Sequence, residues 1–257
     1  MEQRVAVVTG VSRRGGIGFA IASRLAAAGF DLVCAHFAPH DADQPWGADD
    51  VPAVLAGVRE RLLPGRRLVD IEADFADPDA PARVFARAIE AFGHVDALVA
   101  NHARSGGDGT LAESTASMLD AHWAVNARSA LLLARELAAQ HDGRTGGRIV
   151  FLTSGQELGP MPGEVCYAAA KAALAGITKT VAHELAPRGI TVNCVNPGPV
   201  DSDSYVTDEL RAALDGRFPF GRWGEPDDVA RLIAWLVGDD GRWVTGQVIN
   251  SEGGFVR

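Results

Sequence analysis

Segments that favour β-strands alternate with segments that favour helices along the whole chain, and this alternation restricts the possible fold more than any other feature. The first apolar run, Arg4–Thr9, is continuous, as in a strand that a parallel sheet buries on both faces. Further strands are expected at residues 31–36, 68–72, 95–100, 148–153, 191–196 and 247–250. One helix is expected to begin at residue 17 and another to end at residue 92. Further helices are expected at 51–63, 117–140, 167–186 and 225–237. We therefore predict an α/β fold with a doubly wound, Rossmann-type parallel sheet of about seven strands and helices on both faces.

The length and the loops predict a single domain. A chain of 257 residues suits one α/β domain with a large core, so residues 1–257 are expected to fold as one unit. The polar, proline-containing stretch at 38–50 is expected to be a surface loop. A longer loop, at about 199–220, follows the sixth strand, where ligands bind in folds of this kind.

Composition and charge exclude several classes of protein. Apolar residues make up 47% and charged residues 22% of the chain, which is ordinary for a globular protein. The formal net charge of −9 argues against nucleic acid or an anionic membrane as a partner. The first residues lack the pattern of a signal peptide, and no apolar run approaches the length of a membrane span.

The cysteines and histidines indicate neither disulfides nor a metal. The chain has an odd number of cysteines, Cys34, Cys166 and Cys194, and they lack Cys-x-x-Cys spacing. This pattern favours reduced thiols in a cytoplasmic protein. The seven histidines show no spacing typical of metal ligands. We therefore expect no metal site.

A glycine-rich turn, Gly10–Gly18, lies between the first strand and the first helix. Glycines at this place let the backbone approach a pyrophosphate, while the helix N-terminus offers free N–H groups and the positive end of its dipole. A glycine-rich turn alone is often only a turn. Its position between a buried strand and an amphipathic helix favours dinucleotide binding.

Tyr167 and Lys171 are four residues apart in an alanine-rich segment, so a helix places them on one face. A nearby ammonium lowers a phenol pKa from about 10 toward neutrality, which makes the tyrosine a usable general acid or base. Ser154 follows an apolar strand and is expected at the sheet's carboxyl edge. A Tyr-x-x-x-Lys pair alone also occurs on many surface helices, so the dinucleotide turn is what strengthens the interpretation.

With these motifs together, the chain resembles the short-chain dehydrogenase/reductase family over essentially its whole length, and within it is most similar to the β-ketoacyl carrier-protein reductases. Ser154 precedes Tyr167 by 13 residues (167 − 154), as in that family, and Lys171 completes the signature. The Asn-Pro-Gly-Pro segment at 196–199 and the ending at 244–254 also resemble family motifs. The resemblance implies a dinucleotide-binding oxidoreductase domain whose substrate loop is the one at about 199–220.

The resemblance also implies roles for individual residues. Tyr167 would donate a proton to the carbonyl oxygen, Ser154 would hydrogen-bond that oxygen, and Lys171 would lower the tyrosine pKa and bind the nicotinamide ribose. Asn126 would hold a water that links Lys171 to solvent. The residues expected to contact the cofactor are Gly10, Ser12, Arg13, Arg14, Gly16, Ile17, Gly18, His36, Asp74, Phe75, Asn101, Ala103, Tyr167, Lys171, Pro197, Gly198 and Val200.

The sequence departs from the family in two places. Five residues separate Gly10 from Gly16, two more than usual, so the phosphate loop must bulge. The family's Asn-Asn-Ala-Gly appears at 101–104 with Arg104 in place of glycine, either at the pocket mouth or as a solvated loop cation.

The cofactor is expected to be NADP(H) rather than NAD(H). NAD-selective folds usually carry an acidic residue at the end of the second strand, where this chain has His36. Arg13 and Arg14 lie in the phosphate loop and could pair with a 2′-phosphate, with His36 as a third donor; alternatively, both arginines only decorate an exposed bulge. Which arginine meets the phosphate is left open.

These features predict a reductase that converts a ketone, including a 3-oxoacyl thioester, to a secondary alcohol. The alternatives are an NAD-dependent alcohol dehydrogenase of the same family and a dinucleotide-binding regulatory protein without turnover. The expected partner is a small carbonyl or alcohol substrate whose identity the sequence leaves open. The alanine-rich helices, which the family pairs across two-fold axes, predict a homotetramer.

Overall fold

The predicted doubly wound sheet is present in the computed structural model, which describes residues 3–202, 206–214 and 216–257. Its seven strands lie in the order β3-β2-β1-β4-β5-β6-β7, and all neighbours are parallel. Val7 of β1 lies opposite Val33 of β2 and Leu98 of β4. The strands are β1 (Arg4–Thr9), β2 (Phe30–His36), β3 (Leu68–Glu72), β4 (Ala97–Ala100), β5 (Gly147–Leu152), β6 (Ile190–Asn196) and β7 (Val248–Asn250).

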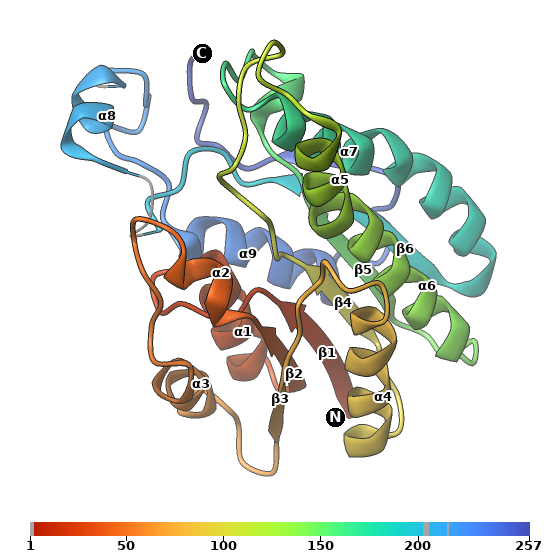
Figure 1. The fold of residues 1–257 in the computed structure, drawn as a ribbon. Coiled ribbons are helices and arrows are strands. Elements are labelled where there is room, and N and C mark those ends of the chain that lie inside the picture. Colours follow the sequence, from red (N-terminus) through yellow and green to blue (C-terminus); the bar gives the residue numbers. More distant parts are fainter. Residues whose placement is uncertain (1–2, 203–205, 215) are drawn as a thin grey trace.

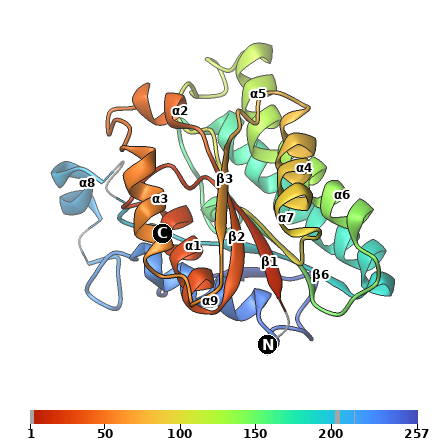
Figure 2. The ribbon, with the colours of Figure 1, turned by 90° about the horizontal axis from the view of Figure 1, so that it is seen from below.

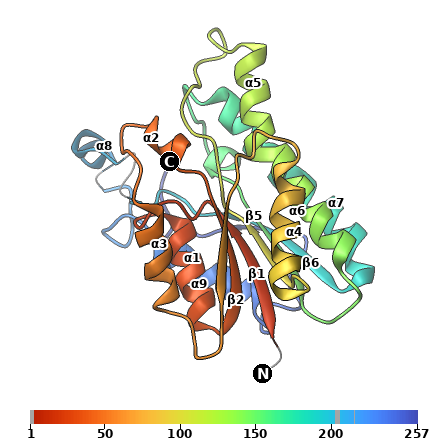
Figure 3. The same ribbon diagram turned by 60° about the horizontal axis from the view of Figure 1, so that its bottom comes forward.

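Helices cover both faces of this sheet, as Figures 2 and 3 show. One face carries α1 (Ile17–Ala27), α3 (Val51–Arg59) and α9 (Pro226–Val237), and the other carries α4 (Ala80–Phe92), α5 (Ala116–Trp123), α6 (Ser129–Gln140) and α7 (Val165–Leu185). Successive residues of β1 point to opposite faces, so Val5 and Val7 join one buried cluster while Ala6 and Val8 join the other. The continuous apolar runs of the sequence follow from this two-sided burial.

The order of the strands creates the place for a ligand. From β1 the chain proceeds outward to β2 and β3, then returns to β4 on the other side of β1. Loops diverge at such a switch point and leave a crevice at the carboxyl ends of the strands. In Figure 1 this edge faces upward, toward α5, α8 (Asp208–Ala213) and the C-terminus.

Three segments differ from the expectations. The stretch at 38–50 is not loop throughout, because a short helix, α2 (Ala38–Ala42), begins with Pro39 in its first turn, where proline is favourable. The helix expected at 117–140 is divided by a π-helical segment, η1 (Ala124–Arg128), into α5 and α6. The substrate loop contains α8, capped by the Thr207 side chain, while residues 203–205 and 215 of that loop lie outside the described residues.

None of the helices in the described part of the chain has the length and apolar character needed to cross a membrane.

Candidate active site

Gly10 and Gly18 of the first turn form a cradle that leaves no room for a side chain at either position. Gly10 has φ +74°, and a Cβ atom there would lie 2.7 Å from Nδ2 of Asn101. A Cβ atom on Gly18 would lie 2.1 Å from the Gly10 carbonyl oxygen, so the helix packs directly on the turn. Gly16 is the N-cap of α1 and supplies no side-chain cap, which leaves the first N–H groups of the helix for a ligand. These features fit the pyrophosphate of a dinucleotide.

Asn101 and Ser12 fix this cradle to the sheet. The Asn101 side chain donates to the Thr9 carbonyl oxygen at 3.0 Å. The Ser12 hydroxyl accepts a hydrogen bond from the Phe37 N–H at 3.1 Å, at the exit of β2. The predicted cofactor residues of the glycine-rich turn therefore lie beside the ends of β2 and β4, at the carboxyl edge of the sheet.

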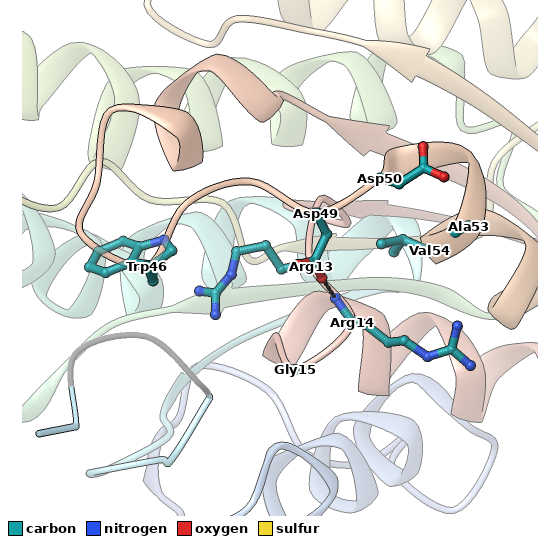
Figure 4. Close-up of a pocket in the computed structure, with 8 residues that line it drawn as sticks. All are labelled: Arg13, Arg14, Gly15, Trp46, Asp49, Asp50, Ala53 and Val54. Carbon is teal, nitrogen blue, oxygen red and sulfur yellow. Dashed lines mark hydrogen bonds between the residues drawn. The ribbon is translucent and has the colours of Figure 1, made fainter. Parts of the chain in front are cut away.

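The two arginines of the inserted loop point in opposite directions, as Figure 4 shows. The Arg13 guanidinium lies over the Trp46 ring, 5.6 Å from its centroid, and donates to the Ser202 carbonyl oxygen at 2.6 Å. The Arg14 guanidinium instead lies over Phe19 of α1 at 5.7 Å. A cavity of about 490 Å³ lies between the phosphate loop and the β2–α3 connection, lined by Arg13, Arg14, Gly15, Trp46, Asp49, Asp50, Ala53 and Val54.

The exits of β2 and β3 hold the next predicted cofactor residues. His36 ends β2, and its Nε2 lies 3.5 Å from an Asp70 carboxylate oxygen on the neighbouring strand. Asp74 is exposed after β3 and accepts a hydrogen bond from the Ala76 N–H at 2.9 Å. Phe75 is buried, and its ring belongs to the hydrophobic core.

Tyr167 and Lys171 lie one turn apart on α7, as expected, with the lysine Nζ 5.7 Å from the centroid of the tyrosine ring. The Lys171 side chain is buried, with 2% of the residue exposed, and its Nζ donates to the Leu152 carbonyl oxygen at 2.9 Å. Burial lowers the pKa of Lys171 to about 8. Leu152 ends β5 and Ser154 follows two residues later, so the same strand exit holds the lysine and presents the serine.

Asn126 is buried in the π-helical segment η1, and its side chain is engaged by the loop after β4. Its Oδ1 accepts from the Arg104 N–H at 2.7 Å, and its Nδ2 donates to the Arg104 carbonyl oxygen at 3.0 Å. The Asn126 side chain therefore holds this loop in place. The backbone of Arg104 is thus part of the site's support.

The chain is similar to known proteins over nearly its whole length. Residues 10–256 match the family described as enoyl-(acyl carrier protein) reductase. The chain is 41% identical to the uncharacterized oxidoreductase YjdA of Bacillus subtilis, covering 100% of this chain and 98% of that protein. It is 37% identical to an NADPH-dependent aldehyde reductase-like chloroplastic protein of Arabidopsis thaliana, covering 98% and 94%.

A solved structure extends the likeness to three dimensions. A short-chain dehydrogenase from Burkholderia cenocepacia J2315, in complex with NADP, superposes with a TM-score of 0.84 at 40% identity, covering 98% of this chain and 97% of that one. The chain belongs to the short-chain dehydrogenase/reductase family. The fold class predicted from the sequence is confirmed.

His102 was not among the predicted site residues of this short-chain dehydrogenase/reductase, although it replaces the second asparagine of the family's Asn-Asn-Ala-Gly segment. Its Nδ1 lies 2.7 Å from the Thr9 hydroxyl, and its Nε2 lies 2.7 Å from the Ser129 hydroxyl. Its ring stacks on Phe75 with centroids 4.0 Å apart. Burial and the charge of Lys171 lower the pKa of His102 to about 3, so the imidazole is neutral and links β1 to α6.

The exit of β6 forms the other wall of the crevice in this family member. Gly198 has φ +70°, and a Cβ atom there would lie 2.4 Å from Cβ of Glu252, so the C-terminal segment packs directly against it. Val200 is buried and pairs with Gly224 in a short parallel bridge. Pro197, Gly198 and Val200, which were expected to contact the cofactor, therefore lie together at the beginning of the substrate loop.

Proposed function

We propose that this short-chain dehydrogenase/reductase is an NADP(H)-dependent oxidoreductase that reduces a small carbonyl compound, a ketone or a 3-oxoacyl thioester, to an alcohol. The observation that carries the proposal is the buried cation of Lys171 beside Tyr167, next to the strand exit that presents Ser154. A buried ammonium beside a phenol favours proton transfer by that phenol near neutral pH.

Each residue has a defined part in the proposed reaction. Bound NADPH supplies the hydride. Tyr167 donates its phenolic proton to the carbonyl oxygen, and Ser154 donates a hydrogen bond to the same oxygen as negative charge develops. The positive charge of Lys171 stabilises the phenolate that remains, and Asn126 supports the water through which the proton is replaced.

The proposed preference for NADP(H) is supported by the charges at the adenosine end. No acidic residue ends β2, and Arg13 extends toward Trp46, which also lines the cavity. The Arg14 guanidinium lies against Phe19 of α1. We assign the 2′-phosphate to Arg13, because a guanidinium pairs such a phosphate through charge-assisted hydrogen bonds. The Asp70 carboxylate beside His36 argues against the imidazole as the main phosphate donor.

The cofactor assignment is tested with kcat/KM for NADPH and NADH on the same carbonyl substrate. We expect a preference for NADPH of about tenfold or more, since a charge-assisted contact contributes about 1.5–3 kcal/mol. Arg13→Ala should remove most of the preference, and Arg14→Ala should leave it nearly unchanged. Equal values for the two cofactors in the wild-type protein would refute the assignment and favour the NAD-dependent alternative.

The catalytic proposal is tested on a panel that contains an aromatic aldehyde, an aromatic ketone and a 3-oxoacyl thioester, each with NADPH. Tyr167→Phe removes one hydroxyl and little volume, so kcat should fall by about two orders of magnitude while NADPH still binds. Normal NADPH binding without turnover of any panel member would favour the non-catalytic dinucleotide-binding alternative.

We also propose that the protein is a cytoplasmic homotetramer. Leu119 and Trp123 of α5 are 41% and 46% exposed, beside the small residues Ala169 and Ala170 of α7. An apolar face with small residues allows close packing of helices from a second copy across a two-fold axis. The buried free thiols of the three cysteines are compatible with a reducing compartment.

A further inference from the structure

The first amides of α7, the helix that carries Tyr167, are bound by residues from a distant segment. The Val165 N–H donates to the Gly109 carbonyl oxygen at 3.2 Å. The N–H groups of Cys166 and Tyr167 donate to the two carboxylate oxygens of Asp108 at 2.9 and 2.7 Å. The residue that precedes the helix in sequence makes no side-chain cap. The N-terminus of α7 is therefore capped by the loop between β4 and α5.

Asp108 is well suited to this role because it is buried and charged. Its side chain is 6% exposed, and its Oδ1 also accepts from the Gly109 N–H at 2.8 Å. Burial raises the pKa of Asp108, but the hydrogen bonds from the N–H groups of Tyr167, Cys166 and Gly109 outweigh it and hold this pKa below its ordinary value. An ionised carboxylate at a helix N-terminus also interacts favourably with the helix dipole.

The loop that carries Asp108 is itself held in place. Its beginning is bound through the Arg104 backbone by the Asn126 side chain. Farther along, the buried His122 ring has its Nε2 3.2 Å from the Gly106 carbonyl oxygen. Asp108 thus connects the part of the protein that contains Asn126 to the first turn of α7.

Tyr167 and Lys171 depend on this cap to different degrees. Tyr167 is the third residue of α7, so it lies in the turn whose amides Asp108 binds. Lys171 lies one turn farther along, and its Nζ is separately held by the Leu152 carbonyl oxygen. Without the carboxylate, two amides of the first turn lose their partners and the turn frays, which moves the tyrosine more than the lysine.

We propose that Asp108 is the positioning residue for Tyr167: its carboxylate holds the first turn of the helix so that the phenol stays aligned with Ser154 and the substrate. The inference rests on the proposed role of Tyr167 as proton donor. Misplacement of a reacting group by about 1 Å can reduce a rate by about 10²-fold, so the cap is expected to affect turnover and not stability alone.

The test compares Asp108→Asn with a matched control, Asp96→Asn. Asparagine has nearly the same shape, but its single oxygen can accept from one of the two amides, and its NH₂ group faces the other. Asp96 is a similarly buried carboxylate, 5% exposed, and accepts from the Val5 N–H at 2.7 Å. It precedes β4, at the opposite edge of the sheet from the active site. Steady-state kinetics with NADPH and the best panel substrate, NADPH binding and thermal unfolding are measured for both variants.

We expect Asp108→Asn to lower kcat by about tenfold or more, with the NADPH dissociation constant changed by less than about twofold. Asp96→Asn should lower the unfolding temperature to a similar degree without this loss of kcat. Asp108→Glu keeps the charge and should recover part of kcat. If Asp108→Asn does not fold, kcat is measured in Asp108→Glu and Asp108→Ser instead.

A wild-type kcat in Asp108→Asn would overturn the inference. If Asp108→Asn does not fold, a wild-type kcat in both Asp108→Glu and Asp108→Ser would overturn it. Tyr167→Phe is measured in parallel. If Tyr167→Phe is inactive while Asp108→Asn is normal, the positioning role alone is wrong. If Tyr167→Phe keeps its kcat, the proposed function and the inference that rests on it are both wrong.

Discussion

Replacement of Lys171 by methionine tests the electrostatic core of the proposed mechanism. Methionine keeps the length and apolar stem of this buried side chain but removes the ammonium, whose Nζ lies 5.7 Å from the centroid of the Tyr167 ring. The same substitution removes the hydrogen bond from Nζ to the Leu152 carbonyl oxygen. The expected consequence is a higher pKa for the Tyr167 phenol.

The magnitude follows from Coulomb's law. A unit charge 5.7 Å from the ring, at an effective dielectric constant of about 20, stabilises the phenolate by about 3 kcal/mol, or about two pKa units. The pKa of the Tyr167 phenol is therefore expected to be lower with the lysine charged than in Lys171→Met. Because burial lowers the pKa of Lys171 to about 8, the lysine charge is fully present below that pH and fades above it, so the two groups titrate together.

The composition of the chain makes this pKa measurable. The sequence contains two tyrosines, Tyr167 and Tyr205, so in a Tyr205→Phe background the ultraviolet absorbance of phenolate reports Tyr167 alone. The absorbance is followed against pH with and without Lys171→Met. In the alcohol-oxidation direction, the acidic limb of kcat against pH should move upward in parallel, because the phenolate is then the proton acceptor.

Lys179→Met is the matched control, because Lys179 lies two turns farther along the same helix and is exposed. It should leave the phenolate midpoint unchanged, since solvent screens an exposed charge. A midpoint that moves by less than about half a unit in Lys171→Met would refute the reasoning, because a neighbouring charge then contributes little to the tyrosine pKa.

Two further predictions concern stability and assembly. The unfolded chain protonates a histidine near pH 6.5, whereas His102 in the folded protein has a pKa of about 3, so this residue makes stability fall as the pH drops between these values. At about pH 4.5 the loss is about 3 kcal/mol, and His102→Asn should remove it. Urea unfolding of both proteins at neutral and acidic pH measures this loss, and an equal loss at acidic pH in both proteins would contradict the prediction. Light scattering at micromolar concentration should give the mass of a tetramer, and Trp123→Glu should reduce the assembly by placing charge on the exposed α5 face. Monomer mass for the wild-type protein would rule out the proposed assembly.

Patterns that are local in sequence were sufficient for the fold and for the centre of the site. The alternation of buried strands and helices predicted the parallel sheet, because two-sided burial requires continuous apolar runs. The spacing of Tyr167 and Lys171 predicted a shared helix face, which the structure shows. The position of Gly10–Gly18 between strand and helix predicted a cradle, and the contacts that exclude a Cβ atom from Gly10 and Gly18 explain why glycine is required there.

Local patterns were less reliable where two signals competed. Proline and polar residues at 38–50 indicated a loop, but Pro39 instead occupies the first turn of α2. The helical periodicity at 117–140 was correct, yet it could not reveal the π-helical segment that contains Asn126. The difference between α- and π-helical hydrogen bonding arises from packing around the turn and leaves little trace in residue spacing.

The sequence by itself determined the individual strands, the glycine-rich turn and the pairing of Tyr167 with Lys171, because these depend on residues within one strand, turn or helix. The tertiary structure alone decided the contacts between distant segments. Asp108 reaches α7 across 59 residues of chain, and Arg13 reaches the Ser202 carbonyl across 189. Such contacts depend on how separate elements pack at the carboxyl edge of the sheet, and no periodicity or spacing of a single segment encodes that packing.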